Sequence, residues 1–172
     1  GVVRMGVFRC PAPGAGVCQW YIDMNNNGQW DGTVGGDAIW NFGLSRDIPV
    51  AGDWTGTGVS KIGVMRCPAA GVCTWYLDIG NQHAYDAATV GTYLFGLTGD
   101  KAVAGPFANN GVTDNIGVFR CPAAGVCTWS AGNAAQAVAY AAALEGIPCR
   151  VFMWRTANPG KVAATRGYGA DV

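Results

Sequence analysis

Residues 62–78 read IGVMRCPAAGVCTWYLD, and close copies of this stretch stand at residues 5–23 and 116–129. The first cysteines of the three copies, Cys10, Cys67 and Cys121, lie 57 and 54 residues apart. A repeat of this length is the size of one four-stranded unit with its loops. The sequence therefore predicts successive copies of one β unit.

Composition supports a mostly β fold. The chain has 172 residues, of which 27 are glycine and only 13% are charged, and alternating apolar residues and turn formers fill its first three quarters. We expect two and a half antiparallel propeller-blade-like repeats with disulfide-stapled hairpins, plus a short α/β C-terminal segment. The expected divisions are repeat 1 at residues 1–61, repeat 2 at 62–115, a partial third repeat (a hairpin) at 116–129, and a tail of different origin at 130–172.

Charge and hydropathy argue against a nucleic-acid partner and against a membrane-spanning segment. The formal net charge is zero, with 11 residues of each sign and no basic run, so nucleic acid is not an expected partner. No apolar run reaches the roughly 18 to 20 residues that a membrane span requires. No signal peptide stands at the start, and the opening residues read as the end of a strand, which favours a processed or excised segment.

Six of the seven cysteines fall in three close pairs, and each pair brackets a Pro/Gly turn between two strand-like runs. That arrangement favours hairpin disulfides, because residues opposite each other across a hairpin lie at disulfide-bonding separation. Disulfides would place the protein outside the cell or on its surface. Free thiols and a zinc site are the alternatives, although zinc would have to gather ligands across repeats. The pairs are Cys10 with Cys18, Cys67 with Cys73, and Cys121 with Cys127, and Cys149 is left over.

The stretch DMNNNGQWDG at residues 23–32 is a candidate calcium loop. Its polar residues at positions 1, 3, 5 and 9 match the opening of such a loop, but Val34 stands where the terminal glutamate is expected. An ordinary Asn-Gly turn is the alternative, and the second copy at residues 78–86 has lost the pattern. The candidate ligands are Asp23, Asn25, Asn27 and Asp31. We predict no firm cofactor, with calcium as the candidate.

The phrases FGL, PVAGDW, IGVMR and TWYLD within residues 1–129 resemble the FG-GAP (VCBS-like, integrin-α-type) β-propeller repeat of bacterial surface proteins. The resemblance implies a calcium-binding turn at Asp53, Thr55 and Thr57. Two of its carboxylates are hydroxyls here, so we expect that turn to have lost its calcium. Propellers need about four to eight blades to close. With fewer, exposed edge strands predict a homo-oligomer or filament.

Residues 130–172 follow a different pattern. We expect an Ala-rich helix over residues 134–145, a strand over 147–153 and a second helix from Pro159 to Arg166. This segment resembles the threonine dehydratase and serine racemase group of pyridoxal-phosphate enzymes, because Ser130, Gly132 and Asn133 match their Ser-x-Gly-Asn-His motif. The resemblance implies a loop that holds the substrate carboxylate and the 3-oxygen of the cofactor ring. Ala134 replaces the histidine, and the family's Schiff-base lysine motif and glycine-rich phosphate loop are missing, so we expect these residues to be vestigial.

Several repeated residues have structural rather than catalytic interpretations. Trp20, Trp75 and Trp129 recur at one repeat position, which favours a core role over stacking on sugars. The single histidine, His83, forms no triad and is expected in a solvated loop. The arginines before each first cysteine are expected to cover aromatic faces or to pair with a neighbouring aspartate; they are Arg9, Arg66 and Arg120.

These observations leave three hypotheses. The main one is a non-catalytic extracellular structural or adhesive repeat protein, not an enzyme, that self-assembles or binds a glycan or surface protein through unclosed blades. The first alternative is a calcium- or glycan-binding module. The second is a fragment of a pyridoxal-phosphate-dependent amino-acid ammonia-lyase within a chimeric sequence.

Overall fold

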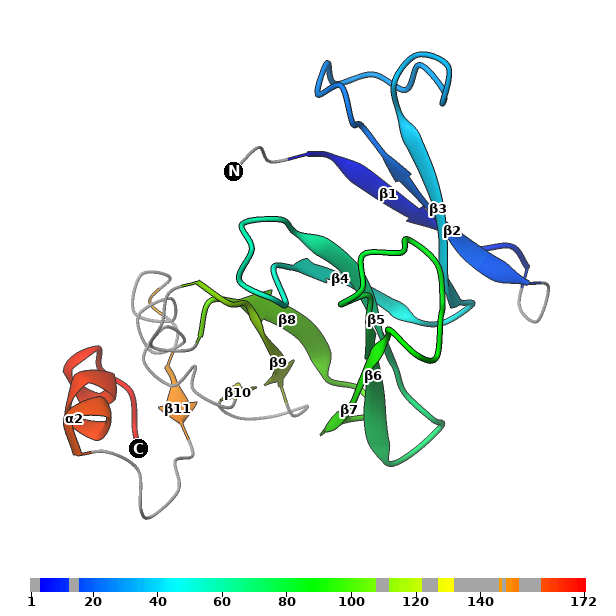
Figure 1. The fold of residues 1–172 in the computed structure, drawn as a ribbon. Coiled ribbons are helices and arrows are strands. Elements are labelled where there is room, and N and C mark those ends of the chain that lie inside the picture. The colour runs from blue at the N-terminus through cyan, green and yellow to red at the C-terminus, as the bar shows by residue number, and fades with distance from the viewer. Residues whose placement is uncertain are drawn as a thin grey trace.

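The strands of the computed structural model form three successive sheets (Figure 1). The structure describes residues 4–12, 16–107, 112–121, 127–131, 146, 148–151 and 159–172. Sheet 1 has the order β1 (Gly6–Arg9), β2 (Val17–Ile22), β3 (Ala38–Leu44). Sheet 2 has the order β4 (Ile48–Gly52), β5 (Lys61–Arg66), β6 (Val72–Leu77), β7 (Gly91–Leu97). Sheet 3 has the order β11 (Arg150–Val151), β10 (Thr128–Ala131), β9 (Asn115–Arg120), β8 (Lys101–Gly105).

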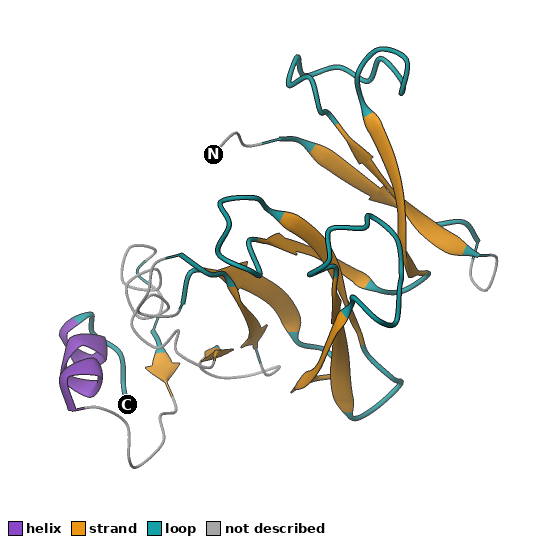
Figure 2. Cartoon of the chain, in the orientation of Figure 1, coloured by secondary structure: helices purple, strands orange, loops and turns teal. Residues whose placement is uncertain are grey.

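The expectation of a mostly β chain with antiparallel sheets is confirmed. Figure 2 shows strands and loops through most of the chain and a helix near the C-terminus, which is α2 (Pro159–Gly167). The residues described form no closed propeller. No helix among them is long and apolar enough to cross a membrane.

The sheets group the strands differently from the sequence repeats. The strand Ile48–Gly52 lies in repeat 1 by sequence, but it pairs with β5 of the next repeat, with Val50 opposite Gly63. Likewise β8 pairs with β9, with Val103 opposite Gly117. The boundary between two sheets therefore falls one strand before the boundary between two sequence repeats. This is because β4 and β8 each pair with the strand that follows them in the chain.

The three predicted hairpin disulfides are confirmed. Each links the end of one strand to the start of the next, with the two Cα atoms 4.2 Å apart; the bonds are Cys10–Cys18, Cys67–Cys73 and Cys121–Cys127. The turn of the second hairpin is tied to the following strand as well, because the Thr98 hydroxyl donates to the Pro68 carbonyl at 2.9 Å. The repeated Pro/Gly turn and its cysteines thus set the register of β5 and β6.

Two apolar clusters join neighbouring sheets. Between sheets 1 and 2, the buried residues are Trp20, Phe42, Ile62 and Val64. Between sheets 2 and 3, a larger cluster centres on Trp75 and Met65, both 0% exposed, and reaches Val118 of β9. The core role of Trp20 and Trp75 is confirmed: their indole N–H groups donate to the carbonyls of Phe42 and Phe95 at 3.1 and 2.8 Å. The side chain of Trp129 lies outside what the structure describes.

The glycine of each FGL phrase permits this close packing. Gly43 and Gly96 have φ of +91° and +84°, a conformation that L side chains rarely adopt. A Cβ on Gly43 would come within 2.9 Å of Val64 Cγ1, and one on Gly96 within 2.7 Å of Val118 Cγ1. These glycines therefore allow each sheet to contact the next.

Candidate functional site

The C-terminal part of sheet 3 is the part of the fold where the strand direction changes. β10 pairs antiparallel with β9 but parallel with β11, with Thr128 opposite Arg150 and Trp129 opposite Val151. A parallel pair needs a long connection between its strands, and β10 and β11 are 18 residues apart in the sequence. The third sheet is thus mixed, because the α/β segment joins it, and it does not continue the all-antiparallel pattern that we expected for the repeats.

The last described residues extend this parallel arrangement. Val151 N donates to the Asp171 carbonyl at 2.7 Å, and Asp171 N donates to the Cys149 carbonyl at 2.9 Å. Between these segments runs α2, which begins at Pro159 and is followed by Gly169 with φ +85°. Proline in the first turn and glycine just past the end are typical helix boundaries, so the predicted second helix is confirmed.

Ser130 occupies the end of β10, opposite Val118 of β9. Ligands in sheets with parallel strands bind beyond the carboxyl ends of the strands, so the loop after β10 is the candidate site. Of its predicted residues, the structure places only the Ser130 backbone. Gly132, Asn133 and the predicted helix over residues 134–145 lie outside the described residues.

The described lysines do not fit a complete pyridoxal-phosphate site at the end of β10. Such a site needs a lysine amine beside the bound cofactor. Lys61 is 6% exposed and its ammonium donates to the hydroxyls of Thr55 and Thr57 in sheet 2. Lys101 begins β8, which β9 separates from β10. Lys161 lies in the first turns of α2, and its side chain is outside the description.

Cys149 stands next to the parallel strands as a free thiol. It is 8% exposed, and burial raises its pKa. Because the thiolate is the nucleophilic and metal-binding form, burial disfavours both roles for Cys149.

The four calcium-ligand candidates all lie in the loop after β2. The carboxylate of Asp23 accepts hydrogen bonds from the backbone N–H groups of Asn27 and Gly28, at 3.2 and 2.8 Å. The side-chain amides of Asn25 and Asn27 both donate to Asp31 Oδ2. Among the residues that the structure places, no group of three or more His, Cys, Asp or Glu side chains is arranged to hold a metal ion. The calcium site therefore stays a prediction.

The matching loop of the second repeat keeps the same backbone despite its changed sequence. Asp78 accepts from Gln82 N and His83 N at 2.9 and 2.7 Å, as Asp23 does in the first loop. His83 takes the positive φ of +59° that Gly28 has at the matching place, where it is +79°. The expectation of a solvated His83 is wrong, because this ring is half-buried against Trp40 of sheet 1.

The turn at residues 53–61 holds a lysine beside the predicted calcium positions. Burial opposes ionisation of Asp53, but hydrogen bonds from Gly58 N, Thr57 N and Thr55 N, with the nearby Lys61 charge, lower its pKa. The Lys61 ammonium contacts both threonine hydroxyls that stand where the resemblance implies carboxylates. The Lys61 ammonium thus lies among the side chains at the positions where the resemblance implies calcium ligands.

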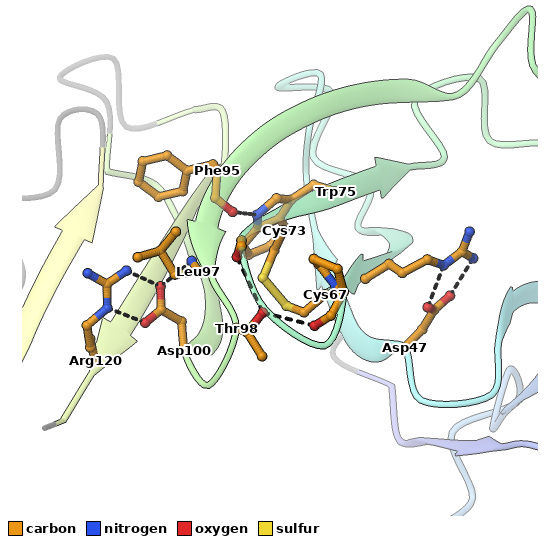
Figure 3. The surroundings of a disulfide bond; sticks show 12 residues. Asp47, Cys67, Cys73, Trp75, Phe95, Leu97, Thr98, Asp100 and Arg120 are labelled. Carbon is orange, nitrogen blue, oxygen red and sulfur yellow. Dashed lines mark hydrogen bonds and ion pairs between the residues drawn. A yellow bond between two sulfur atoms is a disulfide. The ribbon is translucent and has the colours of Figure 1, made fainter. Parts of the chain in front are cut away.

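The repeated arginines form the clearest recurring polar contact. Arg66 donates through Nε and Nη2 to the two carboxylate oxygens of Asp47, both at 2.8 Å. Arg120 does the same with Asp100, at 2.5 and 2.7 Å. Figure 3 shows this pair, together with the hydrogen bond that Asp100 accepts from the backbone N–H of Leu97. Each aspartate side chain is 1% exposed. The sequence predicted an aspartate partner for these arginines without identifying it, although an aspartate directly precedes both β4 and β8.

Comparison with known proteins concerns the C-terminal part of the chain. A sequence model of the family described as "Pyridoxal-phosphate dependent enzyme" matches residues 102–172, a range that begins within β8. The chain is 58% identical over 50 residues to an L-threonine ammonia-lyase of Geobacter sulfurreducens, covering 29% of this chain and 12% of that enzyme. It is 53% identical over 49 residues to a serine racemase of Schizosaccharomyces pombe, covering 28% and 15%.

A longer match is to a beta-hydroxyaspartate dehydratase of Paracoccus denitrificans, 42% identical over 84 residues, covering 48% of this chain and 27% of that enzyme. The chain thus spans about an eighth to a quarter of the length of these curated relatives. No solved structure matches the chain.

These findings confirm the predicted resemblance of the tail and overturn the main functional prediction. The expectation of a non-catalytic structural or adhesive protein is wrong, as is the expectation that the chain is not an enzyme, because the matching family and relatives are enzymes. The prediction of no firm cofactor is wrong for the same reason, since the family is described by pyridoxal phosphate. The repeats fill most of the chain, and the main prediction followed them instead of the short segment that carries the family motif.

Proposed function

We propose that residues 102–172 are a segment of a pyridoxal-phosphate-dependent enzyme of the amino-acid ammonia-lyase and racemase group. The observation that carries the proposal is the 58% identity over 50 residues to an L-threonine ammonia-lyase. The parallel pairing of β10 and β11 supports it, because the motif residue Ser130 then stands at the carboxyl end of a parallel strand.

In this proposal, the loop after β10 binds the carboxylate of an amino-acid substrate. The residues that match the family motif are Ser130, Gly132 and Asn133. A serine hydroxyl and an asparagine amide can both donate to a carboxylate, and glycine lets backbone N–H groups approach it closely. The chain's own contribution is thus to bind and orient the substrate, while the described lysines do not supply the amine that would carry the cofactor.

A segment exchange tests the proposal. Residues 130–172 would replace the matching segment of the Geobacter sulfurreducens L-threonine ammonia-lyase, with ammonia release from L-threonine as the readout. We expect measurable activity that falls about 100-fold in kcat/KM when Ser130→Ala or Asn133→Ala is added, because substrate orientation is lost. Ala134→His should raise the activity, since it completes the family motif.

Arg150→Gln is the matched control in this exchange. Arg150 is 53% exposed in its side chain and pairs with an exposed Asp171, so its loss should leave the activity unchanged. A folded chimera without activity, or one indifferent to Ser130→Ala and Asn133→Ala, would contradict the proposal.

We also infer that the three sheets are copies of one blade-like unit of the FG-GAP type. Support comes from contacts that recur in the same places: the indole N–H to Phe carbonyl bonds, the Arg–Asp pairs and the FGL glycines. Hydrogen exchange would test the inference through Val50 and Val103, which should be similarly protected because their strands are paired alike. Fast exchange at only one of the two would contradict a common unit.

A further inference from the structure

The turn between β4 and β5 surrounds a buried lysine with oxygen atoms. Lys61 begins β5 and is 6% exposed. Its ammonium donates hydrogen bonds to the hydroxyls of Thr55 and Thr57, whose oxygens lie 3.3 Å apart. The Thr57 hydroxyl donates in turn to Asp53 Oδ1 at 3.4 Å. The side chains of Asp53, Thr55 and Thr57, here called the Asp53 cradle, thus present three polar groups to one positive charge.

Backbone hydrogen bonds hold the carboxylate of the cradle in place. Asp53 Oδ1 accepts from Thr57 N at 3.0 Å, and Asp53 Oδ2 accepts from Gly58 N at 2.5 Å. Burial opposes ionisation of Asp53, but these bonds and the Lys61 charge lower its pKa below the ordinary value near 4. The cradle therefore carries a negative charge at neutral pH.

The loop after β2 has the same backbone frame with the opposite charge. Asp23 accepts from the backbone N–H groups four and five residues later, as Asp53 does. Eight residues after Asp23 stands Asp31, which accepts from the side-chain amides at the third and fifth positions of that loop. Eight residues after Asp53 stands Lys61, which donates to hydroxyls at the same two positions. In each loop, the third and fifth side chains therefore match the charge at the ninth position.

The turn that holds Lys61 is bonded to sheet 3 (Figure 1). Asp53 N donates to Asp114 Oδ2 at 2.7 Å, and Asp114 N donates to the Asp53 carbonyl at 2.8 Å. Asp114 directly precedes β9. The position of the turn therefore affects how the start of β9 is held against sheet 2.

We propose that the Asp53 cradle is a binding site for a small cation of the alkylammonium type, which Lys61 fills with its own side chain. The tethered ammonium holds the turn without a metal ion, and through Asp53 it also holds the start of β9. When the lysine is shortened, a free alkylammonium ion takes its place in the same site.

The chemistry of the cradle favours an ammonium over a divalent metal ion. Calcium takes about six to eight oxygen ligands, and its affinity rises with the number of charged ligands. The cradle supplies one carboxylate and two hydroxyls. An ammonium has three N–H donors and no acceptor, so hydroxyl and carboxylate oxygens satisfy it. Because nearly all of Lys61 is buried, its removal beyond Cβ leaves space for a short alkyl chain.

Chemical rescue tests the site in the intact chain. Lys61→Ala should lower the melting temperature by about 5 °C, because the cradle loses its cation. n-Propylammonium chloride, which has the atoms that the variant lacks, should recover about half of that loss at about 50 mM. n-Propanol and tetramethylammonium should recover none, since the first has no charge and the second has no N–H donor. Potassium chloride at the same concentration is the salt control.

Hydrogen exchange adds a local readout to this experiment. The Asp114 amide should exchange faster in Lys61→Ala than in the unaltered chain, because its acceptor is the Asp53 carbonyl. n-Propylammonium should slow this exchange again. A general effect of the salt on stability would not act on this amide in particular.

Two control variants separate the site from its surroundings. Lys61→Met keeps a side chain of similar length without the charge, so n-propylammonium finds no space and should not raise its melting temperature. Lys101→Ala removes another lysine at the start of a strand, but Lys101 is exposed. Its melting temperature should also be unaffected by n-propylammonium.

The unaltered chain gives a test that does not depend on the folding of a variant. In proton–nitrogen NMR at neutral pH, the Lys61 ammonium should give a resolved signal, because buried and hydrogen-bonded N–H groups exchange slowly with water. The exposed Lys101 ammonium should give none. Calcium chloride should leave the backbone amides of Thr57 and Gly58 unshifted, because the cradle is already filled.

Several results would overturn the proposal. A missing Lys61 ammonium signal or calcium-induced shifts at Thr57 and Gly58 would show that the lysine does not fill the cradle. A folded Lys61→Ala variant without a response to n-propylammonium would show that no site remains. Equal rescue by potassium or tetramethylammonium would show that the site does not recognise N–H donors. The segment exchange uses only residues 130–172, so its failure would leave these measurements unaffected.

Discussion

The imidazole ring of His83 lies flat on the indole ring of Trp40, with centroids 3.9 Å apart and planes 9° apart. His83 belongs to the loop after β6, whereas Trp40 belongs to β3, and a parallel bridge between Asn41 and Ala84 accompanies the stacking. The contact thus joins sheet 2 back to sheet 1. It also places a histidine at a backbone conformation that glycine tolerates better, since His83 has φ of +59°.

Substitution of His83 should separate these two effects. His83→Ala loses the stacking and keeps the positive φ, so we expect the free energy of unfolding to fall by about 1 kcal/mol. His83→Gly loses the same stacking but relieves the φ penalty, and should be more stable than His83→Ala by about 1 kcal/mol. Urea unfolding of the three proteins measures both differences. An alanine variant as stable as the glycine variant would show that the loop is not held at this conformation.

The two FGL glycines should be intolerant of alanine. Gly96→Ala places a Cβ within 2.7 Å of Val118 Cγ1 and keeps a positive φ, so we expect a loss of about 2 to 4 kcal/mol. Gly99→Ala is the matched control, because Gly99 has φ of +95° and nothing within 4 Å of its added Cβ. It should lose only about 1 kcal/mol. Equal losses for the two variants, measured by thermal unfolding, would refute the close approach of sheets 2 and 3.

Acid should weaken the Asp100–Arg120 contact. Burial would raise the pKa of Asp100, but the hydrogen bond from Arg120, the bond from Leu97 N and the Arg120 charge together lower it. A carboxylate with a lowered folded-state pKa contributes stability above its unfolded pKa, near 4, and this contribution is lost as the pH falls through the folded value. Asp100→Asn should therefore show a shallower fall in melting temperature below about pH 4 than the unaltered chain.

Asp86→Asn serves as the comparison for that pH series. Asp86 is exposed and accepts a hydrogen bond from Ala88 N at 2.9 Å, without an arginine partner among the described residues. The Asp86→Asn variant thus removes one carboxylate and leaves the Asp100–Arg120 contact in place. Identical profiles for all three proteins would mean that the Arg120 contact contributes nothing to stability.

Removal of a hairpin disulfide should destabilise its sheet. The Cys67–Cys73 bond closes a short loop with a sequence separation of 6, for which chain entropy predicts about 2 kcal/mol. The double variant Cys67→Ala, Cys73→Ala should lose at least that amount in urea unfolding. Cys149→Ala removes a buried thiol that forms no disulfide and should lose less. A double variant no less stable than Cys149→Ala would show that the staple is dispensable.

Much of the fold could be predicted from local signals. Cysteines on either side of a Pro/Gly turn identified the hairpins, because hairpin geometry leaves them few other partners. Pro159 marked the start of α2 for a similarly local reason. The identity of Asp47 and Asp100 as arginine partners was not predicted, because each lies about 20 residues from its partner and meets it only when the first strand of the sheet has paired.

The sequence predicted the motif of the candidate site, but the function was assigned from the repeats and not from that motif. Ser130, Gly132 and Asn133 signalled a pyridoxal-phosphate family, yet the repeats led to a non-catalytic interpretation that the family match overturned. The predicted partners, the extracellular location and the calcium loop at Asp23 stay predictions. Each of them depends on a bound molecule, a metal ion or a cellular compartment, which lies outside the chain itself.

The sequence by itself determined the repeat, the hairpins and the resemblance of the tail, because each depends on residues close together in the chain. Tertiary structure decided how strands group into sheets, since β4 bonds forward to β5 through backbone groups that carry no residue-specific signal. It also decided that β10 and β11 run parallel. Those relationships join segments distant in sequence, and only the packed chain brings them together.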